Sequence, residues 1–199
     1  MFIRSERLFL RPGWPEDWAE LLALIDDESI VRNLARAPWP YRPQDARDFA
    51  SRAQDGHFPH FFVTQPGSAG TRLIGSCGIG RQDGPEGREE AELGYWIARD
   101  QWGNGYATEA VTAMLRLART LGHRHIVAGH FADNPASGRV LAKAGFRPTG
   151  ELRRRYCPAR GERVPAVMHA IDLGRAGDCD NEQAGSEARG DSSDGMRAA

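Results

Sequence analysis

The chain alternates between short apolar runs and segments in which apolar residues recur at helical spacing. Residues 107–121 show the helical pattern most clearly, because their apolar side chains recur every three or four positions and would form one stripe against a sheet. Apolar runs bounded by Gly, Pro or polar clusters are typical of strands. These patterns predict strands at 2–11, 61–65, 72–80, 91–98, 125–131, 146–155 and 164–173, and helices at 15–26, 28–35, 44–54, 107–121 and 134–144.

The order of these segments predicts the fold class. One strand is followed by two or three helices, three antiparallel strands, a helix, a strand, a helix and two final strands, without an internal repeat. This order indicates an α+β, or mixed α/β, fold around one sheet. From Gly174 onward large apolar residues are almost absent, so we expect residues 1–173 to form one domain and residues 174–199 to form a disordered polar tail.

Composition narrows the class of protein. The 199 residues carry a formal net charge of -1, which gives no support to a nucleic-acid or membrane-surface partner. Cys77, Cys157 and Cys179 are odd in number and widely spaced, so we interpret them as free thiols of a reducing compartment. The first residues contain no long apolar run, and no His or Cys residues stand at metal-ligand spacing. We therefore expect a cytoplasmic protein without a bound metal.

The segment Gln101–Ala110 carries the strongest candidate chemistry. Gly103 and Gly105 bracket one residue just before the long helical pattern, and glycine tolerates the positive φ that turns successive backbone N–H groups toward one point. Because a helix N-terminus attracts anions, the segment predicts a phosphate-binding loop, with an ordinary tight turn as the alternative. The missing Gly-Lys-Ser/Thr ending argues against an ATP- or GTP-binding P-loop. No Lys or Arg lies between Gln101 and Glu109, so backbone amides would have to hold the phosphates.

Four motifs in a fixed order resemble one family. They are Leu93–Ile97, Trp102–Ala110, Asn134–Ser137 and Lys143–Phe146. Together they are similar to the GNAT superfamily of acetyl-CoA-dependent N-acetyltransferases, and most of all to its RimJ/RimL-like branch of ribosomal-protein N-terminal acetyltransferases. The resemblance spans about residues 2–173. It implies a GNAT fold, in which one central, mostly antiparallel sheet is splayed at the acetyl-CoA site and flanked by helices. Homodimers are common in this family.

The resemblance also implies which residues bind the co-substrate acetyl-CoA. In the family, the loop before the long helix grips the pyrophosphate through backbone amides. The matching residues here are Gly103, Asn104, Gly105, Ala107 and Thr108. Pantetheine pairs with the strand that ends at Ile97, whose N–H is implied as a donor to the thioester oxygen. Asn134 would hold pantetheine or its strand, although helix N-capping explains an Asn there almost as well. Trp102 stands where the wider family motif has Gln or Arg.

Acetyl transfer to an amine requires a base for the amine proton, a donor for the thioester oxygen and an acid for the departing thiolate. Many relatives place a Tyr as the acid, but the matching position here is Leu141, so the resemblance points to Ser137 instead. A hydrogen-bonding residue of the first helical turn is the other interpretation of Ser137. Glu92 is the candidate base, and a solvated edge carboxylate beside Glu89 and Glu90 is its alternative.

By resemblance, the protein transfers acetyl directly to a primary amine, such as a protein N-terminal α-amine. Small amines, amino acids and antibiotics are acceptors within the same branch. A non-catalytic acyl-CoA-binding or sensing domain is the alternative, and it would lose nothing if Glu92 and Ser137 were altered. Trp39 and Tyr41 are either core residues or walls of the acceptor site. The run Arg153–Arg155 is either a solvated strand end or a partner for an acidic acceptor or the 3′-phosphate of coenzyme A.

Overall fold

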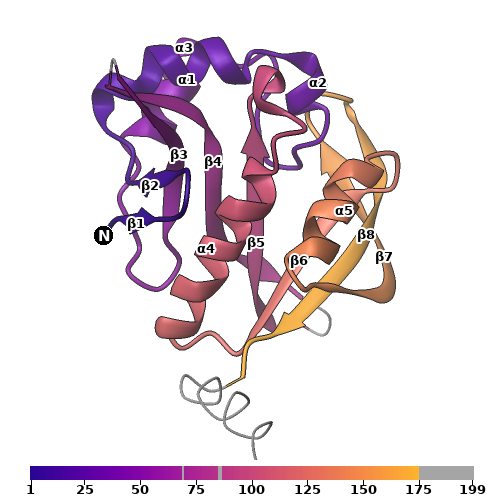
Figure 1. Cartoon of the computed structure of the whole chain (residues 1–199). Helices are drawn as coiled ribbons and strands as arrows, with labels where there is room; N and C mark the ends of the chain where they lie inside the picture. Colours follow the sequence, from indigo (N-terminus) through magenta and orange to yellow (C-terminus); the bar gives the residue numbers. More distant parts are fainter. Residues whose placement is uncertain (69, 85–86, 175–199) are drawn as a thin grey trace, which may run out of the picture.

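The structure is a computed structural model that describes residues 1–68, 70–84 and 87–174. The predicted polar tail, apart from Gly174, lies outside these residues. The strands are β1 Ile3–Arg4, β2 Phe9–Arg11, β3 His60–Gly67, β4 Gly70–Asp83, β5 Glu89–Ile97, β6 His125–Phe131, β7 Arg147–Cys157 and β8 Glu162–Asp172. In the described chain they form one sheet in the order β1-β2-β3-β4-β5-β6-β8-β7 (Figure 1). Only β5 and β6 pair in parallel, so the predicted mostly antiparallel sheet is confirmed.

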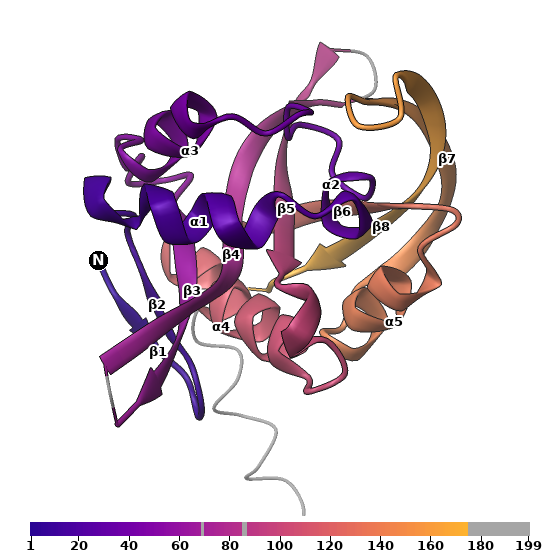
Figure 2. The ribbon, with the colours of Figure 1, turned by 90° about the horizontal axis from the view of Figure 1, so that it is seen from above.

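Helices cover both faces of this sheet. One face carries α1 Trp18–Ile25, α2 Glu28–Val31 and α3 Pro43–Ala50, and the other carries α4 Tyr106–Thr120 and α5 Pro135–Lys143. Figure 2 shows α4 and α5 together along one side of the molecule. The first layer buries Leu21, Val31 and Trp96 in one core, whereas Met114 and Leu141 belong to a second core on the opposite face. The sheet is therefore the middle of three layers.

The long helix forms where the sequence predicts it. Its buried residues, Ala110, Val111, Met114 and Ala118 among them, follow the predicted apolar stripe. The helix begins after Gly105, which has a φ of 81°, and its C-cap is followed by Gly122, which has a φ of 90°. Both glycines adopt the left-handed conformation that other residues rarely take.

The predicted single strand at 2–11 is wrong, because these residues form a hairpin of β1 and β2. The chain turns between the strands, where the Ser5 backbone N–H donates to the Leu8 carbonyl at 3.0 Å. Ser is common at such turns, and this bond ends the extended segment. The hairpin brings residues 5–8 to the first turn of α4.

The predicted helix at 28–35 is also too long, since α2 ends at Val31. Beyond this point the backbone carbonyls turn toward the segment that follows β7. The Cys157 thiol points at the Arg32 carbonyl at 3.4 Å, and Arg160 Nε donates to the same oxygen at 2.8 Å. Long-range partners thus satisfy carbonyl groups that a longer helix would have used internally. The helix predicted at 44–54 likewise ends earlier, at Ala50.

β5 and β6 diverge almost as soon as they meet. Their only recorded pairing is Glu92 with Val127, and no pairing follows toward Ile97 and Phe131. On its other edge β5 remains paired with β4 as far as Ile97. Ala98 N donates to Ile74 O at 2.8 Å, so the alternation of the antiparallel ladder turns the Ile97 N–H and C=O away from β4 and into the gap. The splay predicted by resemblance is therefore present.

Two glycines on these strands allow a matched test of how tightly β4 holds the end of β5. A Cβ on Gly75 would overlap the Trp96 carbonyl oxygen, whereas a Cβ on Gly94 would meet nothing within 4 Å. We expect Gly75→Ala to lower the free energy of unfolding by about 1–3 kcal/mol through overpacking. Gly94→Ala should leave it unchanged or raise it slightly, because Gly weakens strand interiors. Urea unfolding of both variants checks this; equal effects would contradict it.

Candidate active site

A cleft with a volume of about 1050 Å³ lies where β5 and β6 part. Its lining comes from both layers of helices. On one side are the loop at 101–105, the first turn of α4 and the face of α5 that carries Ser137 and Val140. On the other side are α2 with the segment after it, and the face of β5 that carries Glu92 and Trp96. The cleft thus passes through the splayed sheet and can admit one substrate from each face.

The glycine loop has the backbone geometry that the sequence predicts. Gly103 and Gly105 both have a φ of 81°. No side chain caps the N-terminus of α4, and the first helical bond runs from Glu109 N to Gly105 O. The N–H groups of Tyr106, Ala107 and Thr108 therefore lack the intrahelical partners that later residues have. Because Ala107 and Thr108 also line the cleft, the loop suits a phosphate ligand.

Trp102 ties this loop to the end of β5. Its indole Nε1 donates to the Ile97 carbonyl at 2.7 Å. That contact occupies the Ile97 oxygen, while the Ile97 N–H faces the same gap. The indole also explains how Trp serves at a position where the wider family motif has Gln or Arg: it holds the loop against the strand. Within the loop itself, the Asn104 side chain donates to the Gln101 carbonyl at 3.2 Å.

An arginine from the N-terminal hairpin reaches the same loop. Arg7 Nη1 donates to the Asn104 carbonyl at 3.0 Å, and Arg7 N and Nε donate to the Glu109 carboxylate at 2.7 and 2.8 Å. The Ser5 hydroxyl donates to Glu109 Oε1 at 2.7 Å. That backbone amides hold the phosphates stays a prediction, since Arg7 bonds a loop carbonyl and the Glu109 carboxylate. Arg7 and Asn104 are 97 positions apart, and no local pattern signals their contact.

Asn134 and Ser137 lie at the start of α5, beside β5. Asn134 Oδ1 accepts a bond from Ser137 N at 3.2 Å, so the N-cap interpretation of Asn134 is confirmed. The Ser137 hydroxyl lies 2.7 Å from the Tyr95 hydroxyl, across the gap between α5 and β5. Leu141, by contrast, is fully buried in the core. Tyr95 belongs to the motif Leu93–Ile97, and strand alternation places it on the same face as Leu93 and Ile97, but no local pattern signals its contact with Ser137.

Burial raises the pKa of Tyr95 to about 12, despite the opposing hydrogen bond with Ser137. The phenol therefore stays protonated at neutral pH, and its one proton goes either to the Ser137 hydroxyl or to the Ser137 backbone carbonyl, which accepts at 3.2 Å. Ser137 and Tyr95 form a chain of two hydroxyl groups that ends at the cleft. Such a chain can pass a proton toward a group that gains negative charge.

Glu92 is not a solvated edge carboxylate, because it is only 8% exposed. Both of its oxygens accept bonds from Arg155, and Arg36 Nη2 donates to Oε2 at 3.0 Å. The side-chain oxygen Oε1 of Gln82 accepts from Arg36 at 2.5 Å and from Arg155 at 3.3 Å, so Gln82 also belongs to this cluster. The carboxylate lines the cleft on the side opposite Ser137.

The basic run on β7 is not a solvated strand end either. Arg153 pairs with Glu90 at 2.8 Å and with Glu151 at 2.7 Å, and Arg155 pairs with Glu92. Arg154 points to the other face and donates to the Arg163 carbonyl. Of the three, Arg155 lines the cleft.

The remaining candidates divide between core and cleft. Tyr41 is buried, lines the cleft and belongs to the core under α1–α3, whereas Trp39 packs on that core without lining the cleft. Cys77 and Cys157 are free and buried; Cys179 lies outside the described residues. Among the residues that the structure describes, no three His, Cys, Asp or Glu side chains gather as metal ligands would. None of the described helices has both the length and the apolar character needed to cross a bilayer.

Comparison with known families and sequences gives a consistent match. Residues 7–147 match the family described as acetyltransferase (GNAT) domain. "Uncharacterized N-acetyltransferase p20" of Bacillus licheniformis is 30% identical over 172 residues, which cover 84% of this chain and 93% of that protein. "Uncharacterized N-acetyltransferase YoaA" of Bacillus subtilis (strain 168) is 39% identical over 156 residues, which cover 76% of this chain and 86% of that protein.

Solved structures match the fold over most of the chain. A GNAT-family acetyltransferase from Bacillus anthracis has a TM-score of 0.72 at 24% identity and covers 87% of this chain and 99% of its own. RimL, described as a ribosomal L7/L12 alpha-N-protein acetyltransferase in complex with coenzyme A, has a TM-score of 0.71 at 18% identity and covers 87% and 98%. At these identities the likeness concerns the fold.

The bonds from Ser5 and Arg7 of the hairpin to Glu109 of α4, here called the Glu109 clamp, can be tested by mutation of Glu109. Burial raises the pKa of Glu109, but hydrogen bonds from the Arg7 N–H and the Ser5 hydroxyl, with the Arg7 guanidinium, outweigh burial and hold it below 4.5. We expect Glu109→Gln to lower the free energy of unfolding at pH 7 by about 1.5–3 kcal/mol. Because the folded-state pKa is depressed, this loss should be complete above pH 4.5 and should shrink as pH falls through the lowered pKa.

Urea unfolding of wild type and variant between pH 7 and pH 3 measures this difference. Glu6→Gln, an exposed carboxylate in the same turn, is the control and should change little. A Glu109→Gln effect that persists unchanged in acid would contradict the ionised clamp.

Proposed function

The chain belongs to the acetyltransferase (GNAT) family, as an acetyl-CoA-dependent N-acetyltransferase, and we propose that it acetylates protein or peptide N-terminal α-amines directly in a ternary complex. The observation that carries this proposal is the cleft that passes through the splayed sheet. It offers a phosphate loop on one face and, on the other, a strand surface that can receive an extended chain end. RimL, which shares the fold, is described as acetylating a protein α-amine. Small amines, amino acids and antibiotics are the competing acceptors.

The residues around the gap fit acetyl-CoA in this proposal. The backbone N–H groups of Gly103, Asn104, Gly105, Ala107 and Thr108, with the Thr108 hydroxyl, would bind the pyrophosphate. Their support is the left-handed glycines and the uncapped start of α4. The free edge of β5 would pair with pantetheine, and Asn134 Nδ2 would add a donor, because its Oδ1 already caps α5. The acetyl group would then lie near Ile97.

The proposed reaction needs a base for the amine proton, a donor for the thioester oxygen and an acid for the departing thiolate. The amine nitrogen attacks the thioester carbonyl carbon, forming a C–N bond while the C–S bond breaks. The Ile97 N–H, directed into the gap, would stabilise the carbonyl oxygen as it gains charge. Ser137, hydrogen-bonded to Tyr95, would protonate the departing thiolate.

Glu92 remains the proposed base, acting through water. Its Oε1 accepts one bond and its Oε2 accepts two, so Oε1 retains a lone pair for a proton relay. The distance along β5 supports a relay: Glu92 and Trp96 lie on the same face, about 13 Å apart at strand spacing. A proton from an amine near Trp96 would therefore reach Glu92 over ordered water rather than by direct contact.

The glycine loop allows a test that separates ligand binding from backbone strain. Gly103 has a φ of 81° and Gly122 a φ of 90°, and a Cβ on either would meet nothing within 4 Å. Gly103→Ala and Gly122→Ala should therefore both cost about 1–2 kcal/mol of stability through left-handed strain. Only Gly103→Ala should weaken acetyl-CoA binding, measured by calorimetry. Equal binding in both variants would remove the loop from the proposed site.

The catalytic assignments are tested by release of coenzyme A from acetyl-CoA across a panel of peptides and small amines. Ser137→Ala and Glu92→Gln should each lower kcat on the order of 100-fold, with acetyl-CoA still bound. Tyr95→Phe should resemble Ser137→Ala if the two hydroxyls act as a unit. The Glu92→Gln loss should shrink as pH rises, because more of the amine is then neutral without a base.

Ser51→Ala, an exposed serine at the end of α3, is the matched control and should keep full activity. Transfer to small amines but not to peptides would overturn the proposed acceptor. Full activity in Ser137→Ala and Glu92→Gln would overturn the catalytic roles.

A further inference from the structure

A charged cluster stands on the acceptor side of β5 and carries an excess of positive charge. Arg36 and Arg155 flank the single carboxylate of Glu92. Arg155 is held on two sides, because its Nη1 and Nη2 both bond Glu92 and its side chain is 17% exposed. Arg36 is different, since its side chain is 57% exposed. Two cations around one carboxylate leave the cluster with a net charge of about +1.

Arg36 has donors to spare. All three of its recorded bonds, to Glu92, Gln82 and the Arg81 carbonyl, come from Nη2. A guanidinium has five N–H groups. Those on Nη1 and Nε have no hydrogen-bond partner among the residues described, so each can donate a single charge-assisted bond to a carboxylate. Glu92 and Gln82 thus fix one end of the guanidinium and leave the other for a ligand.

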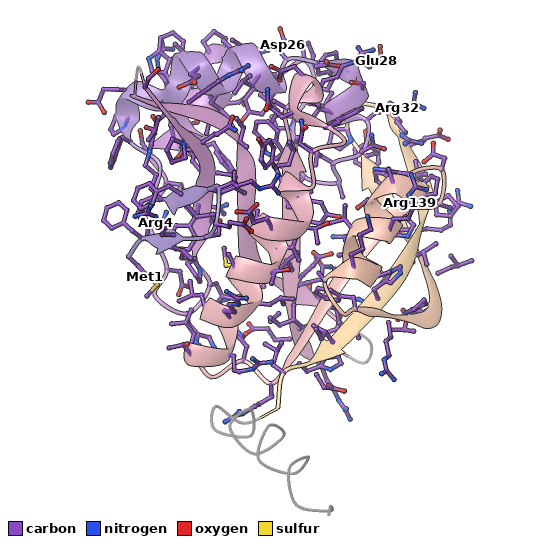
Figure 3. The ribbon with its side chains drawn as sticks, viewed as in Figure 1. Met1, Arg4, Asp26, Glu28, Arg32 and Arg139 are labelled. Carbon is purple, nitrogen blue, oxygen red and sulfur yellow. The ribbon has the colours of Figure 1, made fainter. Side chains whose placement is uncertain are left out.

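The charge of the whole cleft supports an anionic acceptor as well as an anionic co-substrate. Six Lys and Arg side chains line it, against two Asp and Glu. Of the acids, Glu92 is in the cluster and Asp133 is paired with Arg160 and Arg32. Arg139 and Lys143 are on α5, the proposed coenzyme A side; Figure 3 labels Arg139 there and Arg32 after α2. Arg36 and Arg52 remain on the acceptor side.

The floor beside the cluster has room for a peptide backbone. Glu92, Gly94 and Trp96 occupy every second position of β5 and therefore lie on the same face. Gly94 is exposed in the middle of the strand. A Cβ on Gly94 would meet nothing within 4 Å. A chain end lying over Gly94, with its amine near Trp96, would have its fourth or fifth residue beside Glu92 and Arg36, given about 3.3 Å per residue.

We propose that this surface is a subsite for an acidic side chain, so that the preferred acceptors are peptide N-termini with Asp or Glu at the fourth or fifth residue. The inference rests on the proposed acetylation of α-amines and adds its specificity. Arg36 is the residue that pairs with the acceptor carboxylate, and Glu92 with Gln82 positions it. Gly94 leaves the space that the peptide backbone occupies.

The test compares peptides that differ only at the fourth and fifth residues, carrying Asp, Asn or Lys. For the wild type, kcat/KM should be roughly fivefold to tenfold higher with Asp than with Asn, and lowest with Lys. Arg36→Gln should abolish this ratio, mainly by raising KM for the Asp peptide. The ratio is the readout, because loss of Arg36 also disturbs Glu92 and can lower kcat for every acceptor.

Arg42→Gln, an exposed arginine outside the cleft, is the matched control and should keep the ratio. Gly94→Leu should lower transfer to all peptides while acetyl-CoA binding stays at the wild-type level. Peptide acetylation with equal kcat/KM for Asp and Asn would overturn this inference alone, as would a ratio that survives Arg36→Gln. Failure to acetylate any peptide would instead overturn the proposed acceptor class.

Discussion

The structure depends on the divergence of β5 from β6 after a single parallel pairing, at Glu92 and Val127. A fully paired sheet would satisfy the backbone of Tyr95 and Ile97 with another strand and leave no opening between the two layers. The divergence gives β5 one edge held by β4 and one edge available to a ligand. The groups proposed for acetyl transfer, Ile97, Ser137 and Glu92, all line the cleft that opens at this free edge.

Three sets of side-chain contacts hold the opening in shape. Trp102 fixes the glycine loop to the Ile97 carbonyl, and Tyr95 bridges β5 to the start of α5 at Ser137. Arg7 and Glu109 attach the N-terminal hairpin to the loop and to α4. These contacts are made by side chains at the ends of helices and strands, where backbone groups have no regular partners. The same positions can therefore serve both structure and ligand binding.

The buried carboxylate of Glu92 can both hold Arg36 in position and act as the proposed base. Its ion pairs with Arg36 and Arg155 keep its charge compensated inside the sheet, where an unpaired carboxylate would be costly. The same pairs orient Arg36 toward the cleft. A relay through water lets the carboxylate receive a proton without giving up these partners, which links acceptor recognition to the proposed base.

The sequence by itself determined the fold class, the helices and strands with strong periodicity, and the glycine loop, because hydrophobic spacing and the conformational freedom of Gly103 and Gly105 are local properties. Two predictions from the sequence were wrong: residues 2–11 form a hairpin and not one strand, and α2 is shorter than its pattern indicates. The turn at Ser5 and the bonds from Cys157 and Arg160 to the Arg32 carbonyl outweigh the hydrophobic periodicity there. Only the tertiary structure decided that Arg7 reaches the loop, that Tyr95 meets Ser137 and that Glu92 is buried between two arginines. Such contacts depend on how strands far apart in sequence align, and no local pattern encodes that alignment.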